Sequence, residues 1–255
     1  MPLSLIFDDQ LAVITLDRPD VLNALSFALL DKLDRALDRV AASNARALLV
    51  TGAGPKSFCA GADVAELLAS TRQPGPPRTA RGQAIISRLS SLSVPSIAVV
   101  HGFALGGGFE LALACTFRIA TPAARFALPE IKLGLLPGYG GTQRLARLVG
   151  EGRALDLILS GRTLGAEEAL SWGLLNWVQD GEPLSLGKQF ASRFTPFSLL
   201  ASQMARQAVR DGLGLPLEEG LRIETEAIAQ VLHSNDAQEG MAAFLDKRSP
   251  QFKDC

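Results

Sequence analysis

One stretch constrains the fold of this chain more than any other: an apolar, strand-like run leads through glycines into an apolar, helix-like run. Residues 96–100 predict a buried strand, and residues 108–114 predict an internal helix with almost no polar surface. Glycines at 106–108 join the two. Because glycine has no Cβ atom, a ligand can approach this turn closely, and the first N–H groups of the helix can point at it.

Two carboxylates are the main candidates for chemistry. Glu110 lies in the first turn of the predicted internal helix, where it either stabilises the positive end of the helix dipole or serves a site. Glu130 follows a proline at the end of a predicted strand, a position typical of a solvated turn residue or an ion-pair partner. A glycine-dense turn at 134–141, which opens another predicted helix, strengthens the case for a functional role of Glu130.

A second loop of small residues precedes these carboxylates in the chain. Residues 58–63, Phe-Cys-Ala-Gly-Ala-Asp, lie between a Gly/Pro turn and a short helix predicted at 64–69. Small residues in a loop can reflect tight packing alone. Two loops with free backbone N–H groups can instead direct two donors at one oxygen, which is how an oxyanion hole is built.

Composition narrows the class of protein. With 255 residues, of which 47% are hydrophobic, the chain can bury the core of one domain, or of one domain with an appendage. A net charge of −1 offers no electrostatic footprint for nucleic acid or an anionic membrane. The three cysteines share no metal-ligand spacing, and the sequence shows no targeting signal or membrane-spanning run. We therefore expect a cytoplasmic protein without nucleic-acid or membrane partners.

The pattern of elements changes along the chain. An N-terminal hairpin, a surface helix capped by Ser26 and further strands and helices predict an α/β core over residues 1–195. From about residue 183 only helical segments follow, and the predicted C-terminal helical region covers residues 196–255. That region is too small to make a large core alone, so its apolar faces must pack on the core or on another subunit. The Pro/Gly-rich segment 71–81 predicts a surface loop, either a linker or a pocket wall.

Several short motifs occur in an order that is highly specific when they are taken together. They lie at residues 23–25, 58–63, 102–110, 128–130, 135–145 and 244–248. Through them the chain resembles the enoyl-CoA hydratase/isomerase (crotonase) superfamily over essentially its whole length. The resemblance implies a crotonase-like spiral of repeated β-β-α units with a C-terminal α-helical trimerisation region. It also implies a homo-oligomer, either a trimer or a dimer of trimers.

The resemblance further implies the activity of an enoyl-CoA hydratase, a carbon–oxygen lyase of fatty acid β-oxidation. Such an enzyme adds water reversibly across the 2,3 double bond of a 2-enoyl-CoA thioester and forms a 3-hydroxyacyl-CoA. Coenzyme A is part of this substrate, and no metal or redox cofactor is implied.

Residue roles are implied by the same motifs. Glu110 and Glu130 match the two catalytic glutamates, with Glu110 helping to activate the water and Glu130 delivering the proton to C2. The backbone N–H groups of Ala60 and Gly107 are implied to form the oxyanion hole for the thioester oxygen. The residues implied to bind substrate or coenzyme A are Ala60, Gly61, Ala62, Asp63, Gly138, Phe244 and Lys247.

Other functions stay open. A Δ3–Δ2 enoyl-CoA isomerase moves a proton without adding water and can use one glutamate, so the pair of glutamates favours hydration. A hydratase for a branched or carboxylated enoyl-CoA, such as methylglutaconyl-CoA, is a further alternative. The near-neutral charge argues against an RNA-binding role. The presence of both glutamates and both glycine-containing loops argues against a purely structural oligomer. The length and branching of the acyl chain stay open, because they depend on Tyr139 and the loop Gln73–Arg78, whose effect on the pocket the sequence does not define.

Overall fold

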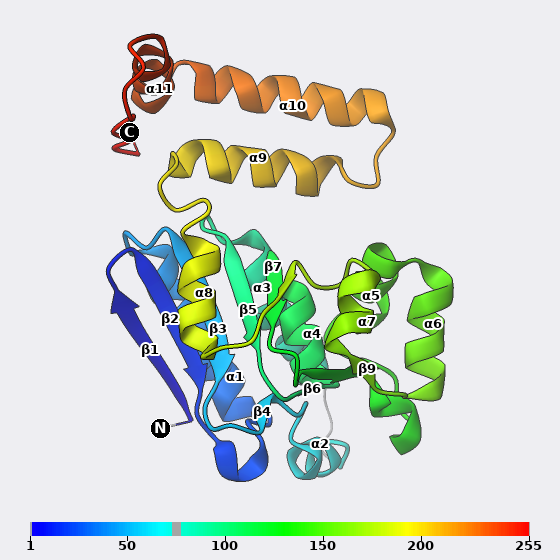
Figure 1. Ribbon diagram of the computed structural model, residues 1–255. Helices are drawn as coiled ribbons and strands as arrows, with labels where there is room; N and C mark the ends of the chain where they lie inside the picture. Colours follow the sequence, from blue (N-terminus) through cyan, green and yellow to red (C-terminus); the bar gives the residue numbers. More distant parts are fainter. Residues whose placement is uncertain (1, 73–77, 255) are drawn as a thin grey trace. The chain divides into compact units, whose positions relative to one another are not determined.

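The computed structural model describes residues 2–72 and 78–254, and the chain divides into two compact units, Met1–Phe190 and Ala191–Cys255 (Figure 1). The predicted loop at 71–81 falls largely on residues 73–77, which lie outside the described residues. Its last part is helical, because α3 (Arg78–Ser91) begins at Arg78. The prediction of a loop up to residue 81 was therefore wrong, since residues 78–81 carry no large apolar side chain that would mark a helix face.

The first unit is built around a six-stranded sheet with the order β1-β2-β3-β5-β7-β10. β1 (Leu3–Asp8) and β2 (Leu11–Leu16) form the predicted antiparallel hairpin. From β2 onward neighbouring strands are parallel, and they are β3 (Ala47–Gly52), β5 (Ser96–Val100), β7 (Phe117–Ala120) and β10 (Trp177–Val178). Every residue of β3 and β5 is buried, which is why these strands read as continuous apolar runs in the sequence.

A smaller sheet has the order β4-β6-β8-β9. Its strands are β4 (Ser57–Cys59), β6 (Phe103–Leu105), β8 (Arg125–Ala127) and β9 (Leu164–Gly165). Each turn of the chain supplies one strand to each sheet and then continues as a helix. The strand pairs are β3 and β4, β5 and β6, and β7 and β8. This arrangement is the spiral of β-β-α units that the resemblance implied. The sequence pattern did not reveal β4 or β6, because three residues are too few to show a period of two.

Helices follow each pair of strands. α1 (Phe27–Ala41) begins at the predicted cap, where the Ser26 hydroxyl accepts a hydrogen bond from the Leu29 N–H at 3.2 Å. α4 (Gly107–Ala114) is buried along its whole length, as its apolar sequence predicted. The other helices up to residue 191 are α2 (Val64–Ser70), α5 (Gly141–Val149), α6 (Glu151–Ser160), α7 (Ala166–Ser171), α8 (Pro183–Ala191) and the 3₁₀ helices η1 (Pro19–Val21) and η2 (Pro129–Leu133).

The second unit is helical, with α9 (Leu199–Gly212), α10 (Leu217–Leu232) and α11 (Asn235–Leu245). α9 and α10 pack side by side (Figure 1), yet neither contains a buried residue. Large apolar side chains of this pair and its connection are 50–74% exposed, namely Val209, Leu213, Leu217, Leu221, Ile228 and Leu232. Within the described part of the chain, no helix is both long enough and apolar enough to cross a membrane.

Candidate active site

Three parallel strands of the smaller sheet end at the same edge and bring the candidate residues together. β4, β6 and β8 are neighbours, with β6 in the middle. The loop after β4 carries residues 60–63, the turn after β6 carries Gly106 and Gly107, and the segment after β8 carries Glu130. The carboxyl ends of neighbouring parallel strands meet at one edge of a sheet. Residues from three distant parts of the sequence therefore converge.

A cavity of about 220 Å³ lies at this edge. Most of the residues that the sequence singled out line it, namely Ala60, Gly61, Ala62, Gly107, Glu110, Glu130 and Gly138. Asp63 is not among the lining residues. Its carboxylate accepts a hydrogen bond from the Glu66 N–H at 3.4 Å, which caps α2, and pairs with the Arg18 guanidinium at 3.2 Å. The geometry therefore gives Asp63 a structural role in holding the loop.

The predicted oxyanion donor Ala60 is already engaged. Its backbone N–H donates a hydrogen bond to the Leu22 carbonyl oxygen at 2.9 Å, so it is not available to a bound oxygen. The assignment of this N–H to the oxyanion hole was therefore wrong. The loop 58–63 contains several N–H groups, and the sequence does not show which of them is paired with a distant carbonyl.

The Ala62 N–H is a free donor of this loop. The peptide groups beside it bind Leu25: the Leu25 N–H donates to the Gly61 carbonyl at 2.7 Å, and the Asp63 N–H donates to the Leu25 carbonyl at 3.0 Å. The Ala62 N–H has no acceptor among the described residues, and neither does that of Gly107, which opens α4. A Cβ atom on Gly107 would lie 3.4 Å from the Ala62 nitrogen, so the two donors lie close together at the cavity.

Glu110 is a buried carboxylate with two backbone donors. The residue is 1% exposed, and its Oε1 atom accepts hydrogen bonds from the N–H groups of Tyr139 and Gly141, each at 2.7 Å. Burial raises the pKa of Glu110 above its ordinary value, while these N–H groups and the positive charge of Arg144 oppose the rise. Stabilisation of a helix dipole does not account for Glu110, because the glycine-rich turn after residue 137 is built around its side chain.

Glu130 faces the same cavity from η2, in a different environment. Its Oε2 atom is buried and has no hydrogen-bond partner among the described residues. Its Oε1 atom lies 2.8 Å from the position of a Cβ atom on Gly106, so a side chain there would displace the Glu130 carboxyl group, and the φ of +48° at Gly106 favours glycine. Burial raises the pKa of Glu130 to about 7; its own backbone N–H opposes the rise, and the charge of Glu110 adds to it. The two carboxyl groups therefore differ in how readily they hold a proton.

Apolar side chains form much of the remaining wall. Val64 and Leu67 come from α2, and Leu133, Leu135 and Leu136 come from η2 and the segment after it. Such a wall suits an apolar chain attached to a polar reacting group. Sequence reasoning missed these leucines, because residues 131–136 follow no regular period.

Two of the predicted coenzyme A contacts belong to the second unit. Phe244, in α11, is 81% exposed, and Lys247 follows that helix with a φ of +54°. Their contact with coenzyme A stays a prediction.

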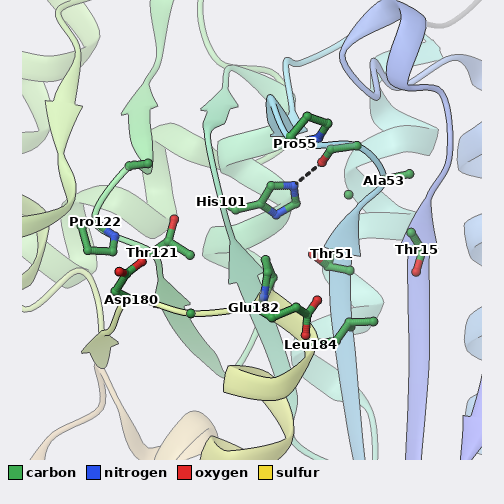
Figure 2. Close-up of a pocket in the computed structure, with 15 residues that line it drawn as sticks. Thr15, Thr51, Ala53, Pro55, His101, Thr121, Pro122, Asp180, Glu182 and Leu184 are labelled. Carbon is green, nitrogen blue, oxygen red and sulfur yellow. Dashed lines mark hydrogen bonds between the residues drawn. The ribbon is translucent and has the colours of Figure 1, made fainter.

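A larger cavity, of about 730 Å³, lies at the carboxyl ends of β3, β5 and β7 (Figure 2). Two of its polar side chains are held by backbone groups, while the buried His101 Nδ1 atom has no hydrogen-bond partner among the described residues. The His101 Nε2–H donates to the Gly54 carbonyl oxygen at 2.8 Å, and the Glu182 carboxylate accepts from the Ser185 N–H at 2.7 Å. Size alone does not locate the chemistry, because the two carboxyl groups with raised pKa values and the paired N–H donors line the smaller cavity.

Comparison with known proteins gives one consistent family. A sequence model of the enoyl-CoA hydratase/isomerase family matches residues 7–255. The chain is 39% identical over 243 residues to a short-chain-enoyl-CoA hydratase of Clostridium acetobutylicum, covering 94% of this chain and 93% of that protein. It is 40% identical over 250 residues to a crotonyl-CoA hydratase of Syntrophomonas wolfei, covering 96% and 95%. The crystal structure of an enoyl-CoA hydratase from Bacillus anthracis superposes with a TM-score of 0.90 at 37% identity, covering 100% of both chains.

Proposed function

The chain belongs to the enoyl-CoA hydratase/isomerase family, and from this membership we propose that it is an enoyl-CoA hydratase. It adds water reversibly across the 2,3 double bond of a 2-enoyl-CoA thioester and forms a 3-hydroxyacyl-CoA. The observation behind this proposal is one cavity that is lined by two carboxyl groups in different environments and by two free backbone N–H donors. Relatives named short-chain-enoyl-CoA hydratase and crotonyl-CoA hydratase support a short acyl chain.

The two N–H donors act on the thioester oxygen. When water attacks C3, the electrons of the double bond move toward that oxygen and give it the charge of an enolate. The N–H groups of Ala62 and Gly107 stabilise this charge without reorganising, because the backbone around them is already held by hydrogen bonds.

The two glutamates move the protons. The Glu110 carboxylate, which already accepts two N–H hydrogen bonds, takes a proton from the attacking water. The Glu130 carboxyl group, with a pKa of about 7, gives its proton to C2. The substrate gains OH at C3 and H at C2, which is one water molecule. The proton taken by Glu110 is then released to solvent and Glu130 takes one up, which restores both groups for the next turnover. Neither step changes an oxidation state, and we propose that the reaction uses no metal or redox cofactor.

The first test is an assay with crotonyl-CoA and the purified protein. Hydration removes the absorbance of the conjugated thioester and increases the product mass by that of one water molecule. Loss of absorbance without the mass change contradicts hydration. Conversion of a 3-enoyl-CoA into a 2-enoyl-CoA, with no hydration of either, makes the protein an isomerase instead.

We expect the activity to fall as the pH rises through about 7. The pKa of Glu130 is raised, so the protonated form that donates to C2 is lost above that pH. kcat/KM for hydration should fall about tenfold per pH unit on the alkaline side, and the Glu130→Gln variant should lack this transition in its residual activity. A flat profile of kcat/KM between pH 6 and 9 contradicts the assignment of Glu130 as the acid.

The second unit supports a homo-oligomer, which we propose to be a trimer or a dimer of trimers. The exposed apolar side chains of α9 and α10 need a covering surface, and a second copy of the chain provides one. Light scattering on the eluting protein should give three or six times the mass of one chain. The mass of a single chain at micromolar concentration contradicts this proposal.

We also propose a cytoplasmic location and a place in fatty acid β-oxidation. The two buried free cysteines, Cys59 and Cys115, support the first, because reducing compartments keep thiols free.

A further inference from the structure

The Tyr139 side chain occupies a confined place beside the reacting groups. Tyr139 is 3% exposed and lines the catalytic cavity. A Cβ atom on Gly107 would lie 2.9 Å from its Cδ2 atom, and a Cβ atom on Gly82 of α3 would lie 2.5 Å from its Cε1 atom. The ring therefore lies between Gly107 of α4 and Gly82 of α3, and any larger residue at either position would collide with it. Burial raises the pKa of Tyr139 to about 12, so the phenol is neutral at physiological pH.

A second cavity lies between α1 and α3, next to the same ring. It measures about 350 Å³, and its walls include Phe27, Leu30, Gly82 and Ile85. Gly82 borders this cavity and also faces the Tyr139 ring. The Cδ1 atom of Leu30 lies 3.2 Å from the position of a Cβ atom on Gly82, so it stands beside the ring. Tyr139 thus lines the catalytic cavity, and Gly82 and Leu30, which lie behind its ring, line the second one.

We propose that the Tyr139 ring is the end wall of the acyl site and restricts the enzyme to short 2-enoyl-CoA thioesters. A longer apolar tail needs space beyond the catalytic cavity of about 220 Å³, and the ring fills the space in front of Gly82 and Leu30. Removing the ring opens the space in front of Gly82 and Leu30 to the added methylene groups. The second cavity behind them is lined by Phe27, Leu30 and Ile85 and by the ion pair of Asp31 and Arg81. This inference rests on the proposed hydratase function.

The test compares kcat/KM for 2-octenoyl-CoA with kcat/KM for crotonyl-CoA. Each methylene group in a fitted pocket changes this quantity by roughly tenfold or more. The ratio should therefore rise at least about tenfold in Tyr139→Ala. Tyr139→Phe is the matched control, which keeps the ring and should keep the wild-type ratio. Adding Gly82→Leu to Tyr139→Ala refills the space from the opposite wall and should lower the ratio again.

An unchanged ratio in Tyr139→Ala, with crotonyl-CoA still hydrated, overturns the proposal. If Tyr139→Ala does not fold, Tyr139→Leu shortens the wall in the same way and is measured in its place. Calorimetric binding of butanoyl-CoA and octanoyl-CoA gives the same comparison without turnover. Failure of the wild type to hydrate either substrate overturns the proposed function, whereas the binding ratio still decides whether Tyr139 is the wall.

Discussion

Replacing Glu130 with Gln should lower kcat for crotonyl-CoA hydration by roughly 10²- to 10⁴-fold, the usual contribution of a positioned acid or base. Glutamine has nearly the same shape but no proton to give to C2. Burial keeps the Glu130 carboxyl protonated up to about pH 7, so the wild type has this proton available and the variant does not. KM should change little, because the residue acts in the transition state and does not hold coenzyme A.

Glu110→Gln should show a loss of similar size for a different reason. The amide oxygen can still accept the hydrogen bonds of Tyr139 and Gly141, so the turn around it should remain folded. An amide is not basic enough to take the proton of the attacking water.

Glu167→Gln is the matched control for both substitutions, because Glu167 is an exposed glutamate on α7. It should leave kcat and the melting temperature unchanged. Near-wild-type turnover in either Glu110→Gln or Glu130→Gln would remove that residue from the mechanism.

Replacing Ala62 with Pro should lower kcat by roughly 10²- to 10³-fold, the cost of losing one oxyanion donor. Proline removes the Ala62 N–H, whereas the bonds of the flanking peptide groups to Leu25 use other atoms. Ala62→Gly keeps the N–H group and should retain most of the activity. A melting temperature close to that of the wild type would show that the loss arises in the site.

Ala60→Pro separates the two candidate donors of this loop. The Ala60 N–H is bonded to the Leu22 carbonyl, so its loss should reduce the free energy of unfolding by about 1–3 kcal/mol. Full activity in Ala62→Pro, together with a large loss of kcat in a stable Ala60→Pro, would return the oxyanion role to Ala60.

Much of the fold follows from local patterns. The apolar runs of β3 and β5, the Ser26 cap of α1 and the wholly apolar α4 are visible in the sequence, because burial selects residue type at each position. The spiral itself was implied by the resemblance, since strands as short as β4 and β6 leave no period to read.

The sequence by itself determined which segments form the candidate site: two small-residue loops, two glutamates and a glycine-rich turn. Only the tertiary structure decided how each group is held. Leu22 occupies the Ala60 N–H, so Ala62 is the free donor beside Gly107. The 139–141 turn holds Glu110, while Glu130 is left with an unpartnered oxygen and a raised pKa. Hydrogen bonding and burial depend on neighbours that are remote in the chain, and no local pattern contains them.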